Sequence, residues 1–201
     1  MTIVTCDLAT TLDGYPAGPS QTLERPFGEI DTETLHAWHF GPLLERHQAE
    51  ADAIVGADAY IMGRNMFSPK SSEAWPADWI GWWGNEPPYH APVFVLTHYE
   101  HAPIELDGGT TFHFVTDGPD SALAQARAVA PADGRISVAG GASTVNAYLA
   151  AGEIDELRLH VVPYAAGLTG GARVFDGVGP IAWTAVTGRW TPEVNHVVYR
   201  R

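Results

Sequence analysis

Short apolar runs recur along the chain, and most are rich in β-branched residues, which favours strands. Strands are predicted over residues 2–9, 59–62, 92–96, 112–115, 136–139 and 157–162. Helical stretches alternate with them over residues 31–52, with an interruption near 40–42, and over 119–130 and 143–151. Two last runs, 181–189 and 194–199, are separated by the segment WTPE and predict an antiparallel hairpin.

The alternation of strands and helices predicts an α/β fold whose central, mostly parallel sheet is covered by helices on both faces. The closing hairpin adds antiparallel strands at one edge, so the sheet is mixed. A chain of 201 residues is long enough for a sizeable core, and we expect a single domain over residues 1–201. In such sheets, ligands bind outside the carboxyl ends of the strands.

Charge and composition narrow the range of partners. The formal net charge is −13, so nucleic acids and anionic membranes are not expected partners, because both require clustered Lys and Arg. No apolar run approaches the ~20 residues of a membrane span, and we expect no secretory signal. Cys6 is the single cysteine, so no disulfide can form within the chain; we expect a core position for it and a cytoplasmic protein.

Three predicted strands end in residues suited to binding phosphate. In VAGGAS, Gly140 and Gly141 separate a strand from a helix, so a diphosphate could approach the bare backbone and the free N–H groups of the helix start. Arg64 follows another strand in MGRNMF and carries a planar, charged fork. Thr97 and His98 follow VFVL. The sequence contains neither GxGxxG nor GxxxxGK[ST] at these junctions, which disfavours an ordinary dinucleotide fold and a nucleoside triphosphatase.

Five segments in this order resemble one family: TLDGY, MGRNMF, VFVLTH, VAGGASTVNAYLAAGEIDELRLHVVP and GARVFDG. Together they are similar to the dihydrofolate reductase superfamily, in the branch that holds the riboflavin-biosynthesis reductase domain and its stand-alone bacterial relatives. The similarity covers nearly the whole chain, and the glycine pair with IDELRLHVVP is its most specific part. The resemblance implies a three-layer α/β/α fold with a mixed, mostly parallel sheet of about eight strands. It also implies that NADPH lies across the carboxyl edge.

The resemblance assigns roles to the residues at this edge. The diphosphate loop corresponds to Gly140, Gly141, Ala142, Ser143, Thr144 and Val145. The adenosine side corresponds to Gly63, Arg64, Asn65, Met66, Thr97 and His98. The loop beside the nicotinamide and substrate corresponds to Leu12, Asp13 and Gly14. In this superfamily the glycine pair is often joined by a cis peptide, which is rare without proline.

Hydride transfer demands little of side chains, because the cofactor carries the reactive hydrogen and the protein positions it. A proton must also reach the product. Asp13 is the catalytic candidate, although Asp before Gly is also common in turns. Asp31 and Glu33 open the first helix, where carboxylates favour the helix dipole, and the tryptophan-proline-acid context of folate reductases is missing there. Dihydrofolate is therefore disfavoured as the substrate.

Four of the seven tryptophans, Trp75, Trp79, Trp82 and Trp83, lie in one long segment over residues 73–90. Two interpretations remain open. The segment forms an aromatic wall for a flat substrate, with Trp82 and Trp83 as substrate-binding residues, or it packs against the core or a partner subunit.

No metal site is predicted. His36 and His39 lie three apart on a predicted helix, but no third ligand has a telling spacing. The favoured function is an NADPH-dependent reductase of a small, flat pteridine- or pyrimidine-like heterocycle. One alternative is the 5-amino-6-ribosylamino-pyrimidine phosphate reductase of riboflavin biosynthesis, which would need several basic groups for the substrate phosphate. Another is a dinucleotide-binding or sensing module without turnover. The family resemblance suggests a homodimer.

Overall fold

Strand β1 (Ile3–Thr10) is buried along nearly its whole length and occupies an interior position in the sheet. Its side chains alternate between two faces, as the pleat requires. Val4, Cys6 and Leu8 enter an apolar cluster on one face, whereas Ala9 joins a second cluster built around Trp38 on the other. This two-sided burial matches a strand that helices cover on both faces.

The structure is a computed structural model that describes residues 2–69 and 75–201. Along the chain after β1 come α1 (Thr32–Phe40), the 3-10 turn η1 (Leu44–His47), α2 (Gln48–Val55), β2 (Ala59–Gly63), α3 (Arg64–Phe67), β3 (Pro92–Leu96), β4 (Ile104–Glu105), η2 (Asp107–Gly109), β5 (Thr111–Val115), α4 (Pro119–Val129), β6 (Arg135–Gly140), α5 (Ala142–Ala151), β7 (Glu156–Val161), β8 (Thr184–Trp190) and β9 (Asn195–Arg200).

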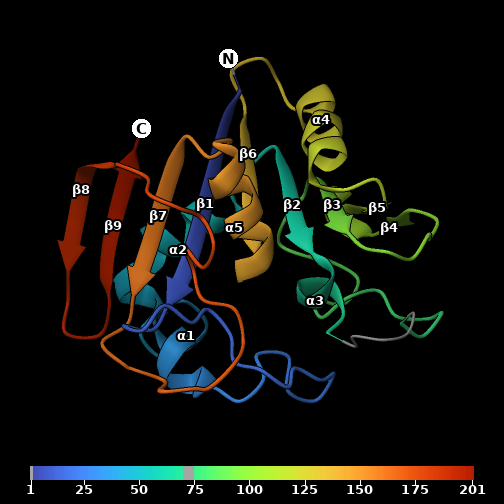
Figure 1. Ribbon diagram of the computed structural model, residues 1–201. Helices are drawn as coiled ribbons and strands as arrows, with labels where there is room; N and C mark the ends of the chain where they lie inside the picture. Colours follow the sequence, from blue (N-terminus) through green and yellow to red (C-terminus); the bar gives the residue numbers. More distant parts are fainter. Residues whose placement is uncertain (1, 70–74) are drawn as a thin grey trace.

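These strands form a single sheet in the order β4-β5-β3-β2-β6-β1-β7-β9-β8 (Figure 1). The six strands from β5 to β7 in this order pair in parallel. Strand β4 at one edge and the β8–β9 hairpin at the other are antiparallel. The predicted mixed, mostly parallel α/β/α fold is confirmed. The described residues contain nine strands where about eight were expected, and the added one is β4, two residues long.

Helices lie on both faces of the sheet (Figure 1). On one face, Ala122 of α4 and Val145 of α5 pack with the alternate residues of β1 and β6. On the other face, α1 packs through Leu35 and Trp38. Figure 1 also shows both chain ends at the amino-terminal edge of the parallel strands, opposite the edge from which α3 and the loop after β1 leave.

The predicted helix over residues 31–52 is broken as expected, into α1 and α2 with η1 between them. Asp31 caps α1, because its carboxylate accepts hydrogen bonds from the backbone N–H of Thr34 at 3.0 Å and from the Thr34 hydroxyl at 2.6 Å. Gly41 ends the helix just before Pro42, which cannot continue it.

Candidate functional site

The carboxyl ends of the parallel strands meet at one edge of the sheet, which places several predicted site residues together. Strand β6 ends at Gly140 and β2 ends at Gly63, and the two strands are neighbours. Strand β1, on the other side of β6, ends at Thr10 and leads into the loop of residues 11–14. The structure therefore brings the predicted diphosphate loop, the Arg64 segment and the loop after β1 to one edge.

The structure accounts for the two adjacent glycines in different ways. Gly140 has a φ of 135°, a conformation that side chains rarely adopt, and an added Cβ there would lie 3.6 Å from the Met66 sulfur. Gly141 has a φ of −75° and is exposed, and an added Cβ would meet nothing within 4 Å. The peptide bond between them is cis, as the family resemblance implies. The open space beside Gly141 is room that a ligand could fill.

Helix α5 starts at this glycine pair without a side-chain cap. Gly141 is the N-cap residue, and the first turn contains no acidic residue. The first N–H groups of a helix have no intrahelical partners, so they can bind an anion, and the helix dipole favours negative charge there. Ser143 is exposed and Thr144 is partly exposed beside them, while Ala142 and Val145 are buried and fix the helix against the sheet.

Gly63 lets helix α5 approach strand β2 closely. An added Cβ at Gly63 would lie 2.5 Å from the Thr144 hydroxyl oxygen, a separation that real Cβ atoms essentially never show. The start of α5 and the start of α3 therefore lie side by side. Asn65 on α3 is exposed, and its amide nitrogen lies 3.5 Å from the Gln21 side-chain oxygen.

The Arg64 guanidinium packs against two aromatic rings. Its guanidinium carbon is 5.3 Å from the centre of the Tyr99 ring and 5.9 Å from that of Trp75, distances at which a cation is attracted to a ring face. Partial burial lowers the pKa of Arg64, but an arginine stays charged at neutral pH. These ring contacts hold the side chain just after the end of β2, and a guanidinium suits a phosphate group.

Thr97 and His98 follow strand β3, two strands from the glycine pair. Thr97 is buried, its backbone N–H donates to Val115, and its hydroxyl accepts from the backbone N–H of Tyr99 at 3.1 Å. Thr97 thus shapes the turn, whereas His98 is exposed at the edge of the sheet.

The loop after β1 is fixed by Asp13. Its carboxylate accepts hydrogen bonds from the Thr11 hydroxyl at 2.6 Å and from the backbone N–H groups of Ala166 and Gly167 at 2.9 and 2.8 Å. Although partial desolvation opposes the shift, these bonds lower its pKa to about 2. A carboxylate that is ionised at neutral pH has no proton to donate, so its contacts favour an anchoring role.

Asp13 and its neighbours tie the loop to the long β7–β8 connection. The backbone N–H of Leu12 donates to Tyr164, and Gly14 accepts from the N–H of Val174. The Leu12 side chain is 61% exposed at this edge, which leaves an apolar surface beside the predicted ligand.

A comparison of the sequence with known protein families assigns the chain to one of them. The profile described as the RibD C-terminal domain matches residues 2–192, nearly the whole chain. The chain belongs to the RibD C-terminal domain family. Membership in this family supports an oxidoreductase. A comparison with curated proteins gave no match.

Solved structures similar to this RibD C-terminal domain share its fold. A protein attributed to riboflavin biosynthesis from Shewanella sp. PV-4 superposes with a TM-score of 0.66 at 21% identity, over 99% of this chain and 98% of that one. The diaminohydroxyphosphoribosylaminopyrimidine deaminase/5-amino-6-(5-phosphoribosylamino)uracil reductase of Thermotoga maritima gives 0.56 at 16% identity, over 99% of this chain and 56% of its own. Dihydrofolate reductase of Enterococcus faecalis, complexed with NADP(H) and RAB-propyl, gives 0.54 at 14%, over 99% and 96%.

The tryptophan segment of this RibD C-terminal domain packs against the sheet; residues 73 and 74 of the segment lie outside the described residues. Trp83 stacks on Phe112 of β5 with ring centres 5.8 Å apart, and the Trp82 indole N–H donates to the Met66 carbonyl oxygen at 3.1 Å. Strand β5 lies four strands from β1, roughly 19 Å at the usual strand spacing. Trp83 thus lies far from Leu12, which favours the packing interpretation for it, and Trp82 lies beside Met66, on the side predicted for the adenosine.

Sequence reasoning missed two residues near the edge. Asn146 of α5 bonds the loop beyond β7 twice, donating to the Arg173 carbonyl oxygen at 2.8 Å and accepting from the backbone N–H of Phe175 at 2.8 Å. The Arg173 guanidinium is exposed and lies 4.8 Å over the Tyr15 ring, and an added Cβ at Gly14 would lie 3.6 Å from the Arg173 Cβ. Arg173 sits in the motif GARVFDG, which gave the only signal for it.

No helix in the described part of the chain is long and apolar enough to cross a membrane.

Proposed function

We propose that this RibD C-terminal domain is an NADPH-dependent reductase of a small, flat, pteridine- or pyrimidine-like heterocycle. The observation that carries the proposal is the open space at Gly141, in front of the uncapped start of α5. A phosphate oxygen is the chemical partner that such a helix start favours. Membership in the family supports the same class of reaction.

The chain supplies a separate binding element for each part of the cofactor. In this proposal the first turn of α5, from Gly140 to Val145, binds the diphosphate. The Gly63–Met66 segment, through Arg64, binds the 2′-phosphate, with Thr97 and His98 beside the adenine ribose. When bound, NADPH supplies a hydride from C4 of its nicotinamide.

The assignment of Arg64 is tested by comparing two cofactors. Arg64→Ala should weaken NADPH binding by about 10- to 100-fold, because a hydrogen bond to a charged group contributes about 1.5–3 kcal/mol. NADH, which lacks the 2′-phosphate, should lose little affinity. Equal loss for both cofactors, measured by calorimetry, would place Arg64 at the diphosphate instead.

The chain's own residues position the substrate and exclude water. Leu12 offers an apolar contact beside the nicotinamide, and Asp13 holds the Leu12 loop to residues 166–167. Asp13 and Asp31 both have lowered pKa values, because each accepts hydrogen bonds as a carboxylate. In this proposal the proton for the reduced substrate therefore comes from solvent water.

A phosphate-bearing substrate, as in the pyrimidine reductase of riboflavin biosynthesis, is the second candidate. One observation favours it: Arg173 presents an exposed cation next to Gly14 on the substrate side of the edge. An arginine fork suits a phosphate group. Arg173→Ala should then raise KM for a phosphorylated pyrimidine and leave KM for an unphosphorylated one unchanged.

The deciding experiment follows transfer of deuterium from C4-labelled NADPH to pteridines, phosphorylated and unphosphorylated pyrimidines, and quinones. Deuterium in one reduced product, with loss of nicotinamide absorbance, supports the reductase and names the substrate. Tight NADPH binding without oxidation by any acceptor would support a sensing module instead. Absence of NADPH binding would overturn both functions.

We also propose that the protein forms a homodimer, on the strength of the family resemblance. Light scattering after size exclusion should give twice the 21.6 kDa chain mass, and a chain-sized particle at all concentrations would contradict the dimer.

A further inference from the structure

Histidines gather on the face of the sheet that α1 and α2 cover. The rings of His39, His47, His160 and His196 surround Trp38, with centroid distances to the Trp38 ring of 4.3 to 6.2 Å. Three of them also meet through ring nitrogens, because His47 Nδ1 lies 2.9 Å from His196 Nε2, and His160 Nδ1 lies 2.7 Å from His196 Nδ1. The proposed function uses none of these rings.

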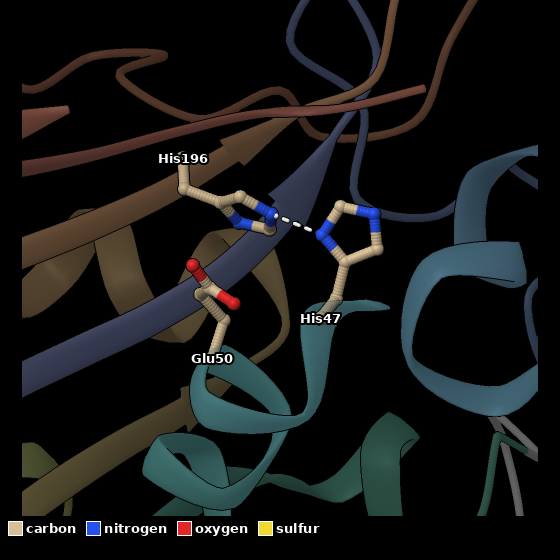
Figure 2. A group of neighbouring side chains, drawn as sticks. All are labelled: His47, Glu50 and His196. Atoms are coloured by element: carbon tan, nitrogen blue, oxygen red, sulfur yellow. Dashed lines mark hydrogen bonds between the residues drawn. The ribbon is translucent and has the colours of Figure 1, made fainter. Parts of the chain in front are cut away.

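Four elements supply His47, Glu50, His160 and His196, and Figure 2 shows His47, Glu50 and His196. His160 of β7 and His196 of β9 are direct partners across the antiparallel ladder. His47 ends η1, and Glu50 follows three residues later in the first turn of α2, on the same side of the helix. One ligand atom from each of His47, Glu50 and His196 lies within 4.8 Å of the others.

The nitrogens in this cluster cannot all be satisfied as they stand. Arg189 Nη2 lies 2.8 Å from His47 Nδ1 and can only donate, so it takes the single lone pair of that nitrogen. His196 Nε2, 2.9 Å from the same atom, must then share that lone pair or turn its own lone pair toward it. A cation between the two imidazoles would satisfy both lone pairs at once.

We propose that His47 Nδ1, His196 Nε2 and the Glu50 carboxylate form a binding site for a divalent first-row transition metal such as Zn²⁺. Two histidines and one carboxylate with an open fourth position are a known zinc ligand set. Tetrahedral zinc separates two nitrogen ligands by about 3.3 Å, so the histidine nitrogens need to move apart by only about 0.4 Å. The proposal does not depend on NADPH or on the reductase.

The surroundings of the cluster supply an outer layer. With His196 Nε2 on a metal, its Nδ1–H donates to His160 Nδ1, and the other N–H of His160 faces Asp7 Oδ1 at 3.9 Å. Both His160 Nε2 and Asp7 Oδ1 are buried without a hydrogen bond in the described structure. A ligating histidine usually donates its second N–H to an acceptor that fixes the ring. For His196 this acceptor is His160, and Asp7 lies behind His160.

In the structure, the guanidinium of Arg189 occupies the position next to Glu50 and His47. Its guanidinium bonds Glu50 through two nitrogens, at 2.7 and 2.8 Å. Its side chain is 39% exposed, so it can turn toward solvent when a metal arrives. A cavity of about 530 Å³, lined in part by Glu50, His160 and His196, gives access from solvent and room for a fourth ligand. Metal and guanidinium therefore compete for one carboxylate.

The test uses the full-length protein, stripped with a chelator and titrated with Co²⁺ and then Zn²⁺. Wild type should bind one equivalent of Co²⁺ with the visible absorption of a four-coordinate site, and Zn²⁺ should displace it. Glu50→Gln and His196→Ala should weaken binding by about 100-fold or more, and His160→Ala by about 10- to 100-fold. Circular dichroism checks that each variant folds.

Arg189→Ala separates a metal site from a structural network. Removal of the competing cation should tighten Co²⁺ binding, whereas loss of one member of a merely structural network would not. His101→Ala, an exposed histidine elsewhere, is the matched control and should bind like wild type. No stoichiometric binding by wild type would overturn the proposal, even if Arg189→Ala bound metal. Unchanged Co²⁺ spectra in both Glu50→Gln and His196→Ala would also overturn it.

Discussion

A negative charge at the start of α5 should affect folding and cofactor binding in opposite directions. Ser143 is exposed, is the second residue of α5, and lies in a first turn that contains no acidic residue. Ser143→Asp places a carboxylate at the positive end of the helix dipole and should stabilise the fold by about 0.3–1 kcal/mol. If the start of α5 has only a structural role, Ser143→Asp should raise stability and leave NADPH binding unchanged.

The same carboxylate should repel a diphosphate. Two like unit charges 4 Å apart repel by about 1 kcal/mol in bulk water and by about 4 kcal/mol at the effective dielectric of a protein surface. A loss of about 1–4 kcal/mol of binding free energy, which is a Kd weaker by about 5-fold or more, is therefore expected for NADPH. Salt screens this repulsion, so the loss should shrink as ionic strength rises.

The assay pairs calorimetric titration of NADPH with urea denaturation of the same samples. Ala150→Asp is the charge-matched control, because Ala150 is exposed near the far end of α5, about 10 Å from Ser143 along the helix. It should bind NADPH like wild type. If Ser143→Asp is more stable than wild type and binds NADPH equally well, the diphosphate does not lie at the start of α5.

Three further predictions concern residues that shape the edge and the core. Gly63→Ala should cost about 1–3 kcal/mol of stability, because its Cβ meets the Thr144 hydroxyl at 2.5 Å. Thr144→Ala added to it should recover most of that loss in urea denaturation, and no recovery would contradict the contact. Asp13→Asn should lower the free energy of unfolding at neutral pH, because it weakens the hydrogen bonds that the carboxylate accepts. The loss should be only about 1 kcal/mol, because these bonds are exposed to solvent. The lowered pKa of Asp13 stabilises the wild type above about pH 4, and this gain is lost as pH falls toward 2. The Asn variant should lack this part of the acid sensitivity. Identical profiles of stability against pH for the two proteins would refute the prediction. Cys6 should react with a thiol reagent only in denaturant, because burial raises its pKa, and fast labelling of the native protein would be inconsistent with that burial.

The strands and the glycine edge could be predicted because their signals are local. Each of the eight expected strands is an apolar run, and Gly140 and Gly141 stand at the end of one. Strand β4 was missed because two residues, Ile104 and Glu105, give no period to detect. Its pairing depends on β5, which carries the stronger pattern.

The contacts that decide individual roles could not be predicted from the sequence. The backbone groups that keep Asp13 ionised come from Ala166 and Gly167, far along the chain. His47 and His196 meet although 149 residues separate them, whereas the spacing of three between His36 and His39 was visible but led to no third ligand. Such pairs depend on the order of strands in the sheet, and a local sequence pattern does not show that order.

The most direct measurement is a crystal structure of the protein grown with NADPH. The account predicts that diphosphate oxygens lie about 2.7–3.2 Å from the backbone nitrogens of the first turn of α5, beside Gly141, with the Arg64 guanidinium on the 2′-phosphate. A nucleotide bound elsewhere on the chain, with the space at Gly141 empty, would contradict it.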